Sequence, residues 1–228
     1  MSKQPPLLEL VDIHYTLAGQ KSPIFNGLQL TVNHGERIAI IAGEAEGKST
    51  LIRLLAGLIT PFSGDILLSG VQLKSPPPQP GGIGLLFLDT ANHFLTPVVQ
   101  EEVMLSMGNS NNQELEKKVA YYLELAGLPS KIATSSLVKL STSQQYRVAV
   151  AALLASQSRI ILADEPGIFL DLNGEQHLAK IFKELAHNKK TTQVIFTSRM
   201  DRAKGFAERI LFLNKGILSN TPSPMGRF

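Results

Sequence analysis

Residues 37–58 read RIAIIAGEAEGKSTLIRLLAGL, and this stretch decides the fold. Its first six residues, Arg37 to Ala42, are a nearly unbroken apolar run, which is typical of a strand buried on both faces of a parallel sheet. From Lys48 onward the apolar residues recur at helical spacing, at Leu51, Ile52, Leu54 and Leu55. The pattern therefore predicts a buried strand, a tight turn and a helix in direct succession.

The turn and the first helical residues carry the chemistry of a phosphate-binding loop. Gly47, Lys48 and Ser49 open the helix, so backbone N–H groups and the positive end of the helix face the phosphates. In this arrangement Lys48 reaches the terminal phosphates and the Ser49 hydroxyl is a ligand for Mg²⁺. A bare glycine-rich turn is the plainer alternative, but the Lys-Ser pair and both flanking elements favour a nucleotide triphosphate site. The residues expected to hold the nucleotide here, called the phosphate loop below, are Gly43, Glu44, Ala45, Glu46, Gly47, Lys48, Ser49 and Thr50.

The phosphate loop departs from the consensus G-x-x-x-x-G-K-S/T. Ala42 stands at the first glycine position and Gly43 follows one residue late, so a reshaped turn is expected. Glu44 and Glu46 place two carboxylates near a polyphosphate, which lowers affinity by an amount that solvent screening keeps modest. We therefore expect nucleotide binding, but weaker than that of a consensus loop.

The composition is that of an ordinary globular protein. With 43% apolar residues in 228, the chain can form one large domain or a domain with a subdomain. The net charge of +3 is spread along the chain, so no basic tract indicates nucleic acid as a partner, and the absence of cysteine excludes thiolate metal sites. The N-terminus lacks the apolar segment of a signal peptide, and no long uncharged apolar run is present. We expect a cytoplasmic protein that reaches a membrane only through a partner.

The remaining pattern predicts an α/β fold with a mainly parallel sheet. An antiparallel β subdomain is expected at the front, buried strands follow, and a hairpin closes the chain. The expected strands and hairpins, apart from 37–42, cover 7–11, 27–32, 65–73, 83–88, 159–163, 193–197 and 210–218.

A helical region at 99–156 interrupts this pattern. Ser110 with Gln113, and Ser141 with Gln144, have the spacing of a capping box, and a long apolar helix is expected at 146–156. We expect a single domain over 1–228. In it, residues 1–98 and 157–228 form the nucleotide-binding core with the β subdomain, and residues 99–156 form a helical subdomain.

Two carboxylates follow the apolar strand at 159–163. Side chains at the carboxyl end of a parallel strand point into the crevice where α/β sheets bind ligands. Asp164 is therefore a candidate for holding Mg²⁺ through water, and Glu165 for orienting or deprotonating the attacking water. The alternative is a solvated turn. Tyr15, after the first strand, either stacks on a nucleotide base or packs in the core.

Taken together, these residues resemble the ATP-binding subunit of an ABC transporter over nearly the whole chain. The tract IGLLFLDTANHFLTPVVQEEV, at 83–103, is most similar to the ATPases of energy-coupling factor importers, which take up vitamins and transition metal ions. The resemblance implies a P-loop NTPase fold, ATP and Mg²⁺ as cofactors, a transmembrane partner subunit, and two cassettes that sandwich two ATP molecules. By position it implies that the base-stacking aromatic is Tyr15, that Lys48 and Ser49 contact the phosphates and Mg²⁺, that Asp164 is the Mg²⁺-associated acid, Glu165 the catalytic base, and Asp171 the D-loop acid.

Three positions depart from the family pattern. Leu88 replaces the Q-loop glutamine, although the adjacent Asp89 is a possible substitute as a Mg²⁺-linked group, and Ser198 replaces the switch histidine. The signature LSGGQ is LSTSQ at 140–144, which keeps Ser141 and Gln144 but loses both glycines. Removing one preorganised polar group from such a site costs about 3 kcal/mol in the transition state, so reduced turnover is expected.

Two hypotheses follow from the resemblance. The chain is a working transporter ATPase, or it is a catalytically inert nucleotide-binding subunit that pairs with an intact paralogue. A heterodimer with a second ABC ATPase is favoured over a homodimer, because it separates the defects between two sites. The apolar side chains Phe94, Leu95, Val98 and Val99 are expected either to dock the membrane partner or to pack internally.

Overall fold

The computed structural model describes residues 5–73, 82–88, 94–108 and 114–222. The strands β6, Ile83–Leu86, β7, Ile160–Asp164, β8, Thr192–Thr197, β3, Arg37–Ala42, β9, Arg209–Asn214, and β10, Ile217–Ser219, form one six-stranded sheet in the order β10-β9-β3-β8-β7-β6. All neighbouring strands in it run parallel except the β9–β10 hairpin. The expected mainly parallel sheet is therefore confirmed.

β3 lies inside this sheet and is buried along its whole length. Successive side chains of a strand point to opposite faces, and those of β3 divide between two hydrophobic cores. Ala39 and Ile41 belong to one core, and Ile38, Ile40 and Ala42 to the other. The unbroken apolar run seen in the sequence is thus explained by burial on both faces.

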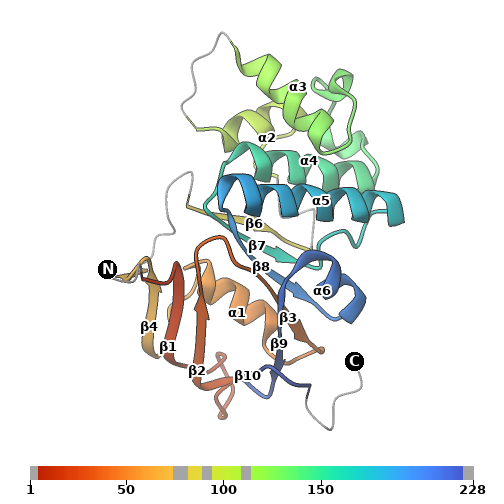
Figure 1. The fold of residues 1–228 in the computed structure, drawn as a ribbon. Coiled ribbons are helices and arrows are strands. Elements are labelled where there is room, and N and C mark those ends of the chain that lie inside the picture. Colours follow the sequence, from red (N-terminus) through yellow and green to blue (C-terminus); the bar gives the residue numbers. More distant parts are fainter. Residues whose placement is uncertain (1–4, 74–81, 89–93, 109–113, 223–228) are drawn as a thin grey trace.

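The second sheet is antiparallel and lies on one side of the first. It contains β2, Phe25–Val32, β1, Leu8–Tyr15, β4, Ser63–Leu68, and β5, Val71–Gln72, in that order. Helix α1, Lys48–Leu55, lies between the two sheets, and its buried side chains share one core with both (Figure 1). The phosphate loop is therefore fixed at both ends by buried elements.

Helices cover the opposite face of the parallel sheet (Figure 1). These are α2, Val99–Ser106, α3, Leu115–Leu125, α4, Thr142–Ala155, α5, Leu172–Lys189, and α6, Met200–Phe206, with short 3₁₀ turns at Ser130–Ile132 and Leu137–Lys139. The α2 to α4 segment comes between β6 and β7, where the sequence predicts a helical region. Among the described residues, no helix combines the length and the apolar character needed to span a membrane.

Several boundaries differ from the sequence expectations. β1 continues to Tyr15 rather than ending at Val11. A β-bulge at Asp12, with φ 51°, shifts the register, and pairing with β2 resumes after it. β6 ends at Leu86, two residues early. α4 begins at Thr142 rather than Tyr146, because Ser141 and Gln144 form the expected capping box with bonds of 3.3 and 3.0 Å. The box expected at 110–113 lies outside the described residues.

The apolar cluster proposed for partner docking divides between the two alternatives. Val99 is fully buried and Phe94 packs partly against the core, so these two side chains pack internally. Leu95, in contrast, is 82% exposed. Val98 is half-buried, so Leu95 is the most exposed of the four side chains and the one most available to a partner.

The β9–β10 turn provides a test of this packing. Gly216 has φ 75°, and a β-carbon there would overlap the backbone carbonyl oxygen of Ile24. We expect Gly216→Ala to lower the free energy of unfolding by about 2–3 kcal/mol, from left-handed strain plus the clash. Gly205→Ala is the matched control, because it adds a methyl group within α6 with nothing inside 4 Å. Urea denaturation should show no loss for Gly205→Ala, and equal stability of both variants would contradict the prediction.

Candidate functional site

The phosphate loop joins β3 directly to α1. Ala42, at the first consensus position, is the buried last residue of β3, and so the turn itself begins at Gly43. Ala45 and Gly47 both adopt left-handed backbone conformations, with φ 62° and 93°. A β-carbon at Gly47 would press against Ile24 and Phe25 at 3.0 Å, which explains the need for glycine before Lys48.

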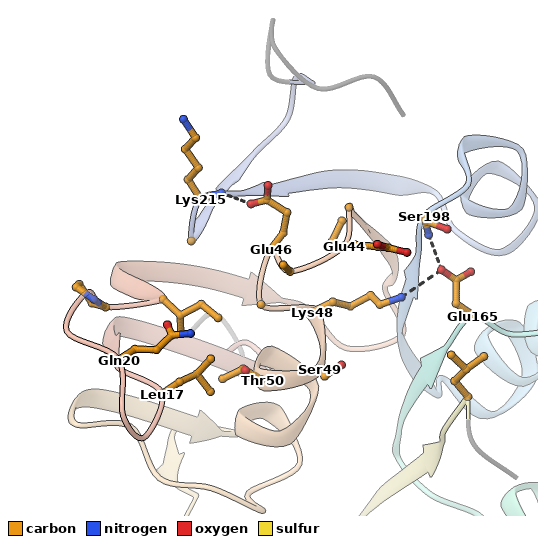
Figure 2. A pocket seen from close by; sticks show the side chains of 18 of the residues that line it. Leu17, Gln20, Glu44, Glu46, Lys48, Ser49, Thr50, Glu165, Ser198 and Lys215 are labelled. Atoms are coloured by element: carbon orange, nitrogen blue, oxygen red, sulfur yellow. Dashed lines mark hydrogen bonds and ion pairs between the residues drawn. The ribbon is translucent and has the colours of Figure 1, made fainter.

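Lys48 points from this loop toward the two carboxylates that follow β7 (Figure 2). Its Nζ lies 3.2 Å from Asp164 Oδ1 and 3.2 Å from Glu165 Oε1. The strand order explains the meeting, because β3 and β7 are separated only by β8 and all three end at the same edge of the sheet. The phosphate loop and the Asp-Glu pair expected from the sequence therefore form one cluster.

Glu165 accepts hydrogen bonds from four groups. At Oε1 it accepts from the Ser198 backbone N–H at 2.6 Å and from Lys48 Nζ at 3.2 Å (Figure 2). At Oε2 it accepts from the Thr197 hydroxyl at 2.7 Å and from Arg202 Nη1 at 2.9 Å. The residue itself is in a left-handed conformation, φ 47°, and only 4% exposed. The end of β8 and the start of α6 thus hold this carboxylate in place.

The two neighbouring carboxylates differ electrostatically. Burial raises the pKa of Asp164, and the Lys48 charge only partly opposes that rise. Burial also acts to raise the pKa of Glu165, but the hydrogen bonds from Thr197 and Ser198 and the charge of Lys48 outweigh it and hold that pKa below the ordinary value. Asp164 Oδ1 is buried and, despite the nearby ammonium group, makes no hydrogen bond among the described residues. Of the two carboxylates, Glu165 is therefore the one whose negative charge is stabilised by hydrogen bonds from the protein.

Arg202 is the site residue that sequence reasoning missed. This α6 side chain bridges two carboxylates, with Nη1 2.9 Å from Glu165 Oε2 and Nε 2.9 Å from Glu175 Oε1. It is 5% exposed, which is unusual for arginine unless its charge is paired. Its position four residues after Ser198 is the only local signal, and that spacing alone does not indicate a partner 37 residues away.

A cleft of about 1020 Å³ opens beside this cluster. Its volume is at the upper end of the range for small-molecule sites, so a nucleotide fits. Figure 2 shows side chains of the phosphate loop and of the β1–β2 connection around it, with Lys215 from the β9–β10 turn. Glu46 Oε2 accepts the backbone N–H of Lys215, so one of the two unfavourable loop carboxylates is tied to the wall of the cleft.

Some predicted site residues lie elsewhere. Tyr15 is half-buried against the core of α1 and is not among the side chains that line the cleft, whereas Leu17 and Gln20 are. Ser141, the N-cap of α4, and Asp171, the N-cap of α5, are exposed and also outside the cleft lining, as is Gln144. Leu88 and Ser198 do line the cleft, and Asp89 is outside the described residues.

A magnesium ion would find a partial donor set here. In the described part of the chain, no group of three or more His, Cys, Asp or Glu side chains could hold a metal ion. The Ser49 hydroxyl lines the cleft, however, and Asp164 has a buried carboxylate oxygen without a hydrogen bond. These are the hard oxygen donors that Mg²⁺ takes together with nucleotide phosphates and water. The residues therefore fit an ion that arrives with its nucleotide.

The fold and the loop define a P-loop NTPase, since a buried parallel strand leads through Gly-Lys-Ser into a helix and faces an Asp-Glu pair across one intervening strand. The family profile described as ABC transporter matches residues 25–167, which is more than half of the chain. The chain belongs to the ABC transporter family, as one of its ATPase subunits.

Individual relatives agree with this assignment. The chain is 30% identical over 226 residues to the energy-coupling factor transporter ATP-binding protein EcfA1 of Ligilactobacillus salivarius, covering 97% of this chain and 79% of the relative. Among solved structures it is similar to the dimeric ATP-binding cassette MJ0796 bound to ADP and Pi, with a TM-score of 0.84, 25% identity, and coverage of 92% and 96% of the two chains. The fold also matches cbiO1 from Clostridium perfringens, part of the ABC transporter complex cbiONQ, with a TM-score of 0.80, 24% identity, and coverage of 94% and 87%.

Proposed function

We propose that this chain binds Mg-ATP in the cleft and, as a subunit attached to a membrane partner, couples ATP binding and hydrolysis to solute import. The observation that carries the proposal is the position of Lys48, whose ammonium group lies 3.2 Å from both Asp164 and Glu165 at the edge of a nucleotide-sized cleft. A phosphate group reaching Lys48 is then next to a candidate metal ligand and a candidate base. Import is the direction of transport that the resemblance of residues 83–103 to the ATPases of energy-coupling factor importers implies.

The proposed roles follow the positions of the side chains. Lys48 and the N–H groups of the phosphate loop bind the phosphates, and Ser49 with Asp164 holds Mg²⁺. Glu165 takes the proton of the attacking water. The ion, when bound, would neutralise charge on the phosphates. This chain supplies the base, Glu165, the phosphate loop and the residues that line the cleft. Tyr15, Asp89 and Asp171 are kept as further candidates for the base-stacking, Mg²⁺-linked and D-loop roles.

Substitution of Lys48 tests nucleotide binding. We expect Lys48→Ala to weaken the affinity for a fluorescent ATP analogue at least tenfold, because a cation beside the phosphates is lost. Arg53→Ala is the control, since it removes an exposed cation from the same helix outside the cleft. Equal affinity of the wild-type protein and Lys48→Ala in a fluorescence titration would contradict the proposed site.

We propose the segment around Leu95 as the contact for the transmembrane subunit. Leu95 is 82% exposed, next to the half-buried Phe94 and just before α2. The backbone at Leu95 is held by the Glu102 carboxylate, which accepts the backbone N–H groups of Leu95 and Thr96 at 2.9 and 3.0 Å. A fixed, exposed apolar side chain is suited to a helix of a membrane subunit, which would hold the chain at the inner face of the cell membrane.

Charge at Leu95 tests that contact. We expect Leu95→Glu to abolish co-purification with the transmembrane transporter subunit, identified by mass spectrometry, while the melting temperature stays within about 2 °C of wild type. Val99→Glu is the contrasting variant, because a charge at this fully buried position should unfold the protein. Loss of stability in Leu95→Glu, or undisturbed co-purification, would show that Leu95 packs internally.

A second cassette is the other proposed partner. MJ0796 is dimeric in its solved structure, and this chain exposes Ser141, Asp171 and the apolar Leu172, which is 70% exposed, outside its own cleft. These residues do not line the cleft of their own chain, which favours a contact with the cleft of a second cassette. We propose a heterodimer, because Leu88, Ser198 and the altered signature would damage both sites of a homodimer. The alternative is that the chain is inert and only completes the dimer.

In such a heterodimer the two sites are unequal. In one site, the intact phosphate loop of the partner faces Ser141 and Gln144 of this chain. The Ser141 hydroxyl and the N-terminus of α4 remain available to the phosphate there, so this site should hydrolyse ATP faster than the other. We therefore expect Glu165→Gln to leave most of the steady-state ATPase activity of the purified complex. The same change of the catalytic glutamate in the partner should remove nearly all of it. If Glu165→Gln alone abolishes hydrolysis, the proposed asymmetry is wrong.

A further inference from the structure

The four hydrogen bonds of Glu165 are arranged on two sides of its carboxylate. A carboxylate offers about four acceptor positions, so in this structure all are occupied. The position occupied by Lys48 faces the phosphate loop (Figure 2). Of the other three donors, Thr197 Oγ1 is on β8, Ser198 N–H belongs to the residue after it, and Arg202 Nη1 comes from α6.

Arg202 is itself held from behind. Its Nε donates to Glu175 on α5, and Glu175 packs beneath Gly167, where a β-carbon would meet Glu175 Cγ at 2.9 Å. The segment after Glu165 is fixed as well, because the Gly167 backbone N–H donates to the buried Tyr146 hydroxyl at 2.9 Å. A planar guanidinium anchored at both ends fixes the direction of its partner far better than a flexible ammonium group does.

We propose that Arg202 is a positioning residue for ATP hydrolysis, which orients Glu165 through Oε2 so that Oε1 faces the terminal phosphate. The inference rests on the proposed function of the cleft. When the phosphates draw Lys48 away, one acceptor position on Oε1 becomes free, and the attacking water donates its hydrogen bond there. The water oxygen bonds to the terminal phosphorus, its proton passes to Oε1, and the bond from that phosphorus to the bridging oxygen breaks. ADP and inorganic phosphate are the products.

Arg202 lines the cleft, but the proposed role acts through Glu165 and not through the nucleotide. Arg202 uses Nη1 for Glu165 and Nε for Glu175, so its charge is already shared by two carboxylates. Ser198 contributes a backbone N–H, and the side chains that donate to Oε2 are those of Thr197 and Arg202, of which Arg202 carries the charge. A base oriented by a third group is a recurrent design of hydrolytic sites. Arg202 therefore lets the slower site of the proposed heterodimer hydrolyse ATP, although Ser198 stands where a histidine is expected.

Single-turnover kinetics tests the proposal, with the purified complex in large excess over Mg-ATP. The catalytic glutamate of the partner cassette is changed to glutamine, so that the hydrolysis measured comes from the site with Glu165. We expect Arg202→Met to lower the rate at least tenfold while the affinity for the fluorescent ATP analogue stays within twofold. Arg202→Lys should restore part of the rate, since it keeps the charge without the planar fork. Glu165→Gln gives the rate without the base.

Arg37→Met is the matched control. Arg37 is 7% exposed, pairs with Glu208 at 2.7 Å, and donates to the Phe206 carbonyl at the end of α6, at the opposite end of β3 from the phosphate loop. It should lose stability but keep its hydrolysis rate below its melting temperature. If Arg202→Met does not fold, Glu175→Met removes the acceptor of the Arg202 Nε hydrogen bond while keeping a side chain of similar length, and it must lower the rate at unchanged affinity.

Several results would overturn the inference. One is an unchanged or higher rate in Arg202→Met or, where that variant does not fold, in Glu175→Met. Another is an affinity that falls in parallel with the rate. The others are an equal loss of rate in Arg37→Met and a wild-type rate no higher than that of Glu165→Gln. None of them concerns nucleotide binding by Lys48. Failure of the proposed function would instead appear as wild-type affinity in Lys48→Ala.

Discussion

Burial of β3 on both faces is the constraint on which the rest of the structure depends. Its alternating side chains belong to two different cores, so a helical layer must cover one face, and α1 with the antiparallel sheet must cover the other. The chain leaves the end of β3 through the phosphate loop and returns immediately as α1. The position of Lys48 is thus set by hydrophobic packing on either side of the loop, and the parallel neighbours β8 and β7 bring Glu165 to the same edge.

Elements with a simple apolar pattern could be predicted from the sequence. The strands of the six-stranded sheet were predicted to within two residues at each end, because their apolar runs are continuous. Helix α5 was not predicted, although Leu178, Ile181, Phe182 and Leu185 follow the helical period and Asp171 caps it through the Gly174 N–H. Their polar neighbours hide this stripe in a simple search for apolar runs. The bulge at Asp12 has no comparable signal, since it depends on pairing with β2 and β4.

The candidate site was predictable only where it is local in the sequence. Gly47, Lys48 and Ser49 are adjacent, and Asp164 and Glu165 directly follow an apolar strand, so both could be found from spacing. The bonds of Glu165 to Thr197, Ser198 and Arg202 join residues more than 30 positions apart. They follow from strand order and the direction of α6, and neither is encoded in a short motif. In the sequence Ser198 indicates only the loss of the switch histidine. The structure shows in addition that its backbone N–H donates a hydrogen bond to Glu165.

Charge balance connects these contacts to the proposed binding of Mg-ATP. The cluster holds three carboxylates, Asp164, Glu165 and Glu175, against two cations, Lys48 and Arg202. Movement of Lys48 to the phosphates leaves only Arg202, which touches Glu165 and Glu175 but not Asp164 in the described contacts. Asp164 would then be a buried anion without a partner, a state that costs several kcal/mol. A divalent cation removes that cost and also neutralises the phosphates. Under the proposed function, nucleotide and Mg²⁺ should therefore bind together, because Lys48 cannot serve the phosphates and Asp164 at once.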